Sequence, residues 1–217
     1  MAKKTVFEYP GKKATVFWNG RLCIHVGECG RAKGEIFVGG RDPWCQPELT
    51  TNEYVADVVT RCPTGALTVD FADGSGKEQP EPENTVNVAY NGPLFIRGRL
   101  VIEAAPTDAP GLAFRTALCR CGKSRNKPFC DNSHEKEGFS DYGAVGATGT
   151  DELAAGGALR IKPVKDGPLM INGNVTIRNS SGRDAWQGDR VVLCRCGESA
   201  NKPFCDGSHK QAGFRSD

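Results

Sequence analysis

The side chains of this sequence that could do chemistry are mainly cysteines and histidines. The chain has ten cysteines and only three histidines. Most of them fall into two sets with the same spacing, Cys119, Cys121, Cys130 and His134, then Cys194, Cys196, Cys205 and His209. Thiolates and imidazoles are ligands for iron, zinc and copper. Cysteines separated by one residue lie on the same side of an extended segment, so each Cys-x-Cys pair can chelate one metal centre.

The third cysteine and the histidine of each set are four residues apart. If Asp206 or Ser208 begins a helical turn, Cys205 and His209 lie on one face of that turn. The free N–H groups of the turn can then point at a negatively charged centre. We expect Ser199 either to hydrogen-bond a ligand sulfur or to cap the intervening loop.

The two sets belong to an internal repeat. Residues 119–139 (CRCGKSRNKPFCDNSHEKEGF) align with residues 194–214 (CRCGESANKPFCDGSHKQAGF) at an offset of 75 residues. The same offset aligns residues 92–94 with residues 167–169. Self-similarity of this length indicates two copies of one structural unit.

The repeated motif, Cys-x-Cys-x2-Ser-x3-Pro-x-Cys-Asp-Gly-Ser-His, resembles the CDGSH iron–sulfur family, which includes the mitoNEET-like proteins. Residues 205–209 match it letter for letter, whereas the first copy has Asn132 in place of glycine, a residue that tolerates a left-handed backbone. The resemblance implies a β-rich fold and two [2Fe–2S] clusters, with the two repeats paired as an intrachain pseudo-dimer. It also implies ligands for an inner iron (Cys119 and Cys121, or Cys194 and Cys196) and for an outer iron (Cys130 and His134, or Cys205 and His209).

One histidine in place of a thiolate has two physical consequences. It makes the cluster less negative, which favours the reduced state. It also supplies a ligand that can be protonated, so we expect cluster loss at acidic pH. A set of three cysteines and one histidine can also hold structural zinc, and the spacing alone leaves that alternative open.

The first part of the chain contains a further group of candidate ligands, Cys23, His25, Cys29, Cys45 and Cys62. The run from Cys23 to Cys29 has the spacing of a ferredoxin Cys-x2-Cys-x2-Cys run with Val26 in the middle place. Cys62 precedes Pro63, as the closing ligand of a ferredoxin cluster does. The unit resembles divergent single-cluster ferredoxin domains. Cys23, Cys29 and Cys62 suit a [3Fe–4S] cluster, a [4Fe–4S] cluster needs a fourth ligand such as His25 or Cys45, and a ferredoxin-like fold without a cluster remains an alternative.

Elements that could position these residues follow from local patterns. Residues 51–61 predict a helix with Thr50 or Thr51 as its cap, which would deliver Cys62. We expect strands at residues 14–18, 66–71, 113–119 and 191–194, and hairpins at residues 93–102 and 169–177, the second with an Asn-Gly turn. Linkers rich in Gly, Pro or Ala at residues 72–83 and 141–158 divide the chain. The predicted fold class is α+β, with a ferredoxin-like domain at residues 1–72 and CDGSH repeats at residues 88–140 and 163–217.

Composition narrows the function. The net charge is +2 without a basic stripe, which argues against nucleic-acid binding. No apolar run approaches the length of a membrane span or a signal peptide. We therefore expect a cytoplasmic protein, where clustered cysteines favour metal over disulfides. Without a phosphate loop, a Rossmann fingerprint or a catalytic triad, we expect no enzyme. One-electron transfer between redox proteins is the leading hypothesis. A cluster carrier that serves cluster-acceptor proteins, a redox or pH sensor, and a zinc interaction module are the alternatives.

Overall fold

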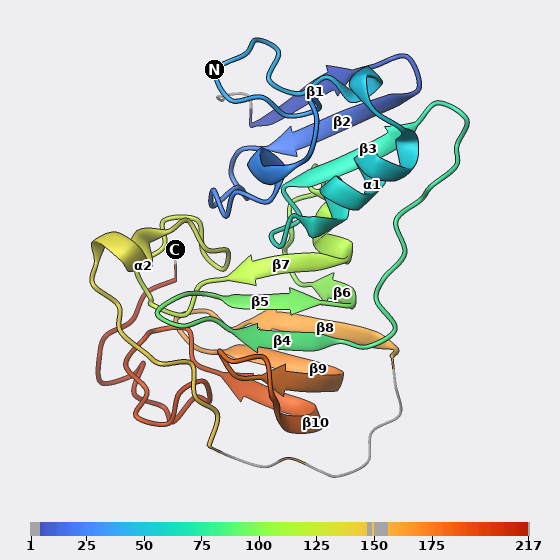
Figure 1. Cartoon of the computed structure of the whole chain (residues 1–217). Helices are drawn as coiled ribbons and strands as arrows, with labels where there is room; N and C mark the ends of the chain where they lie inside the picture. Colours follow the sequence, from blue (N-terminus) through green and yellow to red (C-terminus); the bar gives the residue numbers. More distant parts are fainter. Residues whose placement is uncertain (1–4, 147–148, 150–155, 217) are drawn as a thin grey trace.

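Two β-sheets organise the protein, a three-stranded sheet at the N-terminal side and a seven-stranded sheet beneath it (Figure 1). The computed structural model describes residues 5–146, 149 and 156–216. Residues 1–4 of the first predicted unit, residue 217 of the last one, and residues 147, 148 and 150–155 of the second predicted linker lie outside this part. The fold is α+β and rich in strands, as predicted. Over the described residues, no helix combines the length and apolarity that crossing a membrane requires.

The smaller sheet has the order β1-β2-β3 and is covered by helix α1 (Asn52–Arg61). Its strands are β1 (Val6–Pro10), β2 (Ala14–Asn19) and β3 (Leu67–Phe71). Val55, Val58 and Val59 form the buried face of α1, and the Thr51 side chain accepts a hydrogen bond from the Tyr54 N–H. The predicted helix, its cap and the two predicted strands are confirmed. Strand β1 was not predicted, because it is a short edge strand that ends in proline and has no strongly buried face.

The larger sheet combines both repeats in the order β6-β8-β9-β4-β5-β7, with β10 paired to β9. Its strands are β4 (Thr85–Val88), β5 (Leu94–Arg97), β6 (Arg99–Ile102), β7 (Arg115–Leu118), β8 (Ala158–Pro163), β9 (Leu169–Arg178) and β10 (Asp184–Leu193). Short helices lie at Cys29–Arg31, Pro47–Leu49, Pro110–Ala113 and, as α2, Ser133–Lys136. The strands predicted before each Cys-x-Cys pair correspond to β7 and β10.

Both predicted hairpins are wrong. Strand β6 pairs in parallel with β8 of the other repeat, and the second half of β9 pairs in parallel with β4. The glycines that were expected to reverse the chain instead bend a strand that continues, with φ of 136° at Gly98 and 119° at Gly173. A side chain at Gly173 would collide with the Ala158 carbonyl. Asn84 joins the two bends, because its carboxamide accepts from the Arg99 N–H (2.9 Å) and donates to the Asn174 carbonyl (2.9 Å).

This exchange of strands gives the two repeats one shared core. Aliphatic side chains from both repeats are fully buried together, among them Val86, Ile96, Leu159, Ile171 and Ile177. Burying such side chains contributes roughly 1.5–3 kcal/mol each to folding. The loops that follow β7 and β10 emerge at the same end of the sheet, on the side of α2 and the C-terminus in Figure 1. The fold therefore places both Cys/His motifs on one side of one rigid sheet.

Candidate metal centres

The end of a strand positions the donors of each repeat. After β7, the Cys119 N–H donates to the Pro128 carbonyl (2.8 Å) and the Cys130 N–H donates to the Ala117 carbonyl (2.9 Å). After β10, Cys194 and Cys205 make the same two bonds, at 2.8 and 2.9 Å. The loop between the second and third cysteines thus folds back onto its own strand. Backbone hydrogen bonds, and not side-chain freedom, set where the thiols lie.

Within each repeat the four donors are arranged as two pairs. The sulfur atoms of Cys119 and Cys121 are 3.7 Å apart, and those of Cys194 and Cys196 are 3.6 Å apart. The Cys130 sulfur lies 3.5 Å from His134 Nδ1, and the equivalent distance in the second repeat is also 3.5 Å. A tetrahedral ion with metal–sulfur bonds of about 2.3 Å and metal–nitrogen bonds of about 2.0 Å fits between partners at these separations.

The pairs do not merge into a single four-donor site. Across residues 5–146, 149 and 156–216, no three His, Cys, Asp or Glu side chains are grouped so that they could hold one ion. A structural zinc site needs all four donors around one atom. Each pair of donors suits one metal ion, so the residues present fit a centre with two metal ions in each repeat.

Backbone N–H groups surround the ligand sulfurs. The Lys123 N–H donates to Cys121 Sγ (3.4 Å) and the Glu198 N–H donates to Cys196 Sγ (3.4 Å). At the other pair, the Asn132 N–H lies 3.5 Å from Cys130 Sγ, and the second repeat has the same contact at 3.4 Å. Such bonds stabilise negative charge on sulfur and raise the potential of an iron–sulfur centre. Asn132 adopts the left-handed φ of 67°, so the departure from glycine preserves the turn, as predicted.

The thiols differ in acidity. A hydrogen bond from Cys121 lowers the pKa of Cys119 to about 6, and Cys196 does the same for Cys194. Burial raises the pKa of Cys130 to about 12. Within each Cys-x-Cys pair the hydrogen bond therefore favours the thiolate form of the first cysteine, which is the form that binds metal.

Ser199 caps its loop, which is one of the two roles predicted for it, whereas the supporting residue Arg120 was not singled out by the sequence analysis. The hydroxyl of Ser199 donates to the Phe204 carbonyl (2.7 Å) and accepts from the Asn201 N–H (3.0 Å), so it caps the loop. The Arg120 guanidinium, between the two cysteines, donates to the Gly92 carbonyl (2.9 Å) and pairs with Asp141. Its counterpart in the second repeat makes the equivalent backbone bond, at 3.0 Å. The sequence signal that could have identified Arg120 is that an arginine lies between the two cysteines in both repeats.

The two Cys-x-Cys turns touch each other. A side chain on Gly122 would collide with the backbone carbonyl of Cys196, and one on Gly197 would lie 2.8 Å from the Cys121 carbonyl. The contact is reciprocal, as expected for two copies related by an approximate twofold axis.

A third group of candidate ligands lines a cavity of about 510 Å³ in the N-terminal unit. Cys23, Cys29, Cys62 and His25 contribute to its wall together with apolar side chains. Helix α1 ends at Arg61 and is followed directly by its C-cap residue Cys62, so the helix delivers Cys62 as predicted. Burial raises the pKa of Cys29, and the charges of Cys23 and Cys62, which line the same cavity, add to the increase.

Cys45 is placed differently. It is 1% exposed and belongs to the core beneath α1, with Val55 and Val58, and it is absent from the described lining of the cavity. Burial raises the pKa of its thiol to about 12. Of the two predicted candidates for a fourth ligand, the structure therefore brings His25 to the cavity and packs Cys45 in the core.

Comparison with known proteins gives two family matches. An iron-binding zinc finger model of CDGSH type matches residues 91–135 and 166–210. A model of a divergent 4Fe-4S mono-cluster matches residues 9–70. The chain is also 39% identical over 59 residues to the uncharacterized protein YjdI of Escherichia coli strain K12, a match that covers 27% of this chain and 78% of YjdI. The corresponding protein of Escherichia coli O157:H7 gives the same values.

The paired donors and these matches define an iron–sulfur protein. More particularly, the chain belongs to the CDGSH iron–sulfur family, in a form that joins two CDGSH repeats to an N-terminal divergent 4Fe-4S mono-cluster domain.

Proposed function

We propose that the protein is a non-enzymatic one-electron carrier with a [2Fe–2S] centre in each CDGSH repeat and a third centre in the N-terminal unit. The observation that carries the proposal is the division of each repeat's donors into a Cys-Cys pair and a Cys-His pair. Each pair suits one iron, and two irons that share sulfide cycle by a single electron. Redox proteins are the partners that such a carrier needs.

For the N-terminal unit we propose a [4Fe–4S] centre held by Cys23, Cys29, Cys62 and His25. Support comes from the cavity that these four side chains line and from the match of residues 9–70 to a divergent 4Fe-4S mono-cluster model. If His25 were not a ligand, the three cysteines would suit a [3Fe–4S] centre. The His25→Ala variant separates the two, because only a four-iron centre loses iron or changes its EPR signal when this ring is removed.

Burial supports electron transfer over cluster donation. Cys119 and Cys194 are 1% and 0% exposed, so the inner ligands are enclosed by protein. A buried, pre-shaped site retains its centre and reorganises little when an electron is added.

A second candidate function, cluster donation, is favoured by one feature of the second repeat. Cys205 and His209 are only half-buried, which gives an acceptor protein access to that side.

The test is a redox titration of anaerobically purified protein, with iron measured before and after several cycles. An electron carrier returns to its starting spectrum with its iron unchanged. Incubation with an apo-ferredoxin follows. Transfer of iron and sulfide to that acceptor, with loss from this protein, would favour the carrier function and contradict the first proposal.

A further inference from the structure

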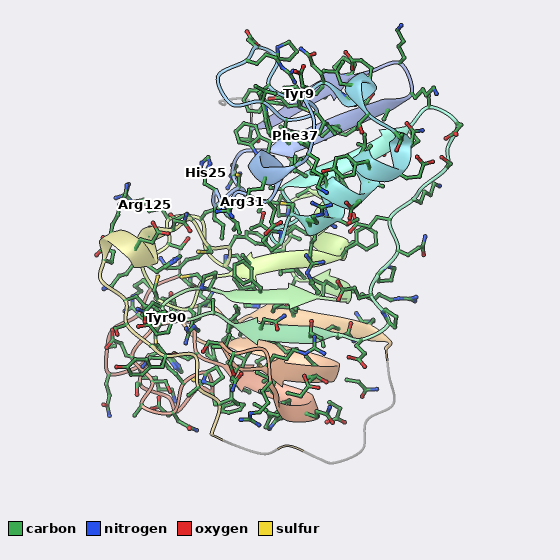
Figure 2. All side chains as sticks on the ribbon, in the orientation of Figure 1. Tyr9, His25, Arg31, Phe37, Tyr90 and Arg125 are labelled. Atoms are coloured by element: carbon green, nitrogen blue, oxygen red, sulfur yellow. The ribbon has the colours of Figure 1, made fainter. Side chains whose placement is uncertain are left out.

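The N-terminal unit is docked on the first repeat through the loop that holds its own ligands. The Asn132 carboxamide donates to the Ile24 carbonyl at 2.6 Å. The Ile24 side chain is buried against Cys130 and Ala117. Beside this contact, the Asn126 carboxamide donates to the Arg21 carbonyl (2.7 Å). Figure 2 shows His25 on the face of the upper unit that lies toward α2 and Arg125.

Asn132 contacts the candidate ligand Cys130 and also the residue that follows the candidate ligand Cys23. Its backbone N–H donates to the sulfur of Cys130, an outer ligand of the first repeat, at 3.5 Å. Its side chain reaches the carbonyl of Ile24, which directly follows the ligand Cys23. A continuous route therefore joins Cys23 to Cys130. It runs along the backbone from Cys23 to the Ile24 carbonyl, through the hydrogen bond to the Asn132 side chain, and through the hydrogen bond from the Asn132 N–H to Cys130 Sγ.

The second repeat lacks this connection. At the equivalent position it has Gly207, which keeps the N–H bond to Cys205 Sγ (3.4 Å) but has no side chain. A second contact of the N-terminal unit also involves the first repeat and has no equivalent in the second. Arg115 of the first repeat donates to the Cys62 carbonyl (2.5 Å), whereas its counterpart Arg190 is exposed. The single substitution within the family motif thus coincides with the repeat that faces the N-terminal ligands.

The two repeats are in turn joined at their inner ligands, because Gly122 abuts Cys196 and Gly197 abuts Cys121. The order of the three ligand groups in the molecule is therefore N-terminal unit, first repeat, second repeat.

We propose that Asn132 is a positioning residue that bridges the N-terminal centre and the first CDGSH centre for single-electron exchange, so that electrons reach the second repeat through the first. This inference rests on the third centre of the proposed function. In each exchange one electron is lost by the reduced N-terminal centre and gained by the first repeat, where one ferric ion becomes ferrous. No covalent bond forms or breaks. A low-potential one-electron donor supplies the electron to the N-terminal centre.

Asn132→Gly tests the bridge cleanly. The variant restores the residue of the second repeat, tolerates the left-handed backbone and keeps the N–H beside Cys130, so only the side-chain bond to Ile24 is lost. Asn126→Ala is the matched control, because it removes a docking bond at the same contact without touching the route. Oxidised holoprotein is mixed with substoichiometric dithionite, and freeze-quench EPR follows the N-terminal and CDGSH signals. Midpoint potentials and iron per chain are measured on the same samples.

We expect Asn132→Gly to slow the exchange several-fold with potentials and iron unchanged, while Asn126→Ala exchanges at the wild-type rate. An unchanged rate in Asn132→Gly, or an equal slowing in both variants, overturns the bridge. A wild-type protein with about four irons per chain and no N-terminal signal overturns the third centre itself and the bridge with it. The first two results leave the proposed function intact, so the failures are distinguishable.

Discussion

The two histidines proposed as ligands are equivalent in sequence but differ in burial. His134 is 9% exposed and Cys130 is 3% exposed, whereas their counterparts His209 and Cys205 are half-buried. Burial lowers the pKa of His134, because the charged imidazolium loses hydration. A ring with a lowered pKa takes up its proton only at more acidic pH and stays available to a metal for longer as the pH falls.

The two centres should therefore differ in acid stability. We expect the second repeat to lose its iron at a higher pH than the first, so that bleaching of the visible bands on acidification occurs in two steps. Variants that lack one set of cysteines assign each step. Loss from both repeats at the same pH, or from the first repeat earlier, would contradict the burial argument.

Replacing both histidines tests their role as ligands. In the double variant His134→Cys and His209→Cys we expect the midpoint potential to fall by on the order of 100 mV or more, because thiolate adds negative charge to each centre. The acid lability of these centres should disappear as well. Potentiometric titration and acidification of the loaded protein provide the two readouts. Unchanged acid lability would show that the histidines do not bind iron.

At the scale of elements, strand β7 holds the N-terminal unit against the larger sheet through the buried guanidinium of Arg115. Arg115 is 1% exposed and donates to the carbonyls of Cys62 (2.5 Å), Val59 (3.0 Å) and Leu67 (2.8 Å), and it also pairs with Glu78. Burial lowers its pKa to about 10, which still leaves it charged at neutral pH. The guanidinium thereby holds the end of α1, and with it the proposed ligand Cys62, against the larger sheet.

Removing that cation should be costly. For Arg115→Ala we expect a loss of about 3 kcal/mol or more of unfolding free energy, since the half-buried Glu78 carboxylate and three backbone carbonyls lose their partner. Arg190→Ala, at the equivalent but exposed position, should cost close to nothing. Urea denaturation of the iron-loaded protein measures both. Equal effects in the two variants would exclude the docking role.

The element scale also shows where sequence reasoning succeeds and fails. Helix α1 was predictable because the Thr51 cap and the apolar spacing of Val55, Val58 and Val59 are local signals. The bends at Gly98 and Gly173 carry the same local signal as a hairpin turn. Whether the chain reverses or continues there depends on which strand of the other repeat is available to pair, and that choice is not local.

At the scale of the whole molecule, the two repeats behave as one unit because strands are exchanged and the Cys-x-Cys turns are in contact. The paired ligands of each repeat were predictable, since the motif fixes both residue type and spacing. The contact between Asn132 and Ile24 was not, because it joins segments 108 residues apart. The docking role of Arg115 was not predictable for another reason. The equivalent residue of the second repeat, Arg190, is also an arginine but is exposed, so the repeat alignment does not distinguish the two roles.

The contact between the turns can be tested by adding one methyl group. Gly122→Ala would drive a Cβ into the Cys196 backbone, whereas Gly138→Ala has a similar left-handed φ and open space around its Cβ. In both variants, alanine at a positive φ lowers the free energy of unfolding by about 1–2 kcal/mol. We expect Gly122→Ala to lose about 1–3 kcal/mol more in urea denaturation, through overpacking between the repeats. Equal losses would mean that the turns do not pack tightly.

The claim on which the rest depends is that each CDGSH repeat holds a binuclear iron–sulfur centre. The most direct measurement is the content of iron, acid-labile sulfide and zinc in protein purified without oxygen, together with its visible spectrum. We expect visible bands that bleach with dithionite and seven to eight irons per chain, about four of them from the two repeats. A colourless protein with about two zincs per chain and no sulfide would contradict the account.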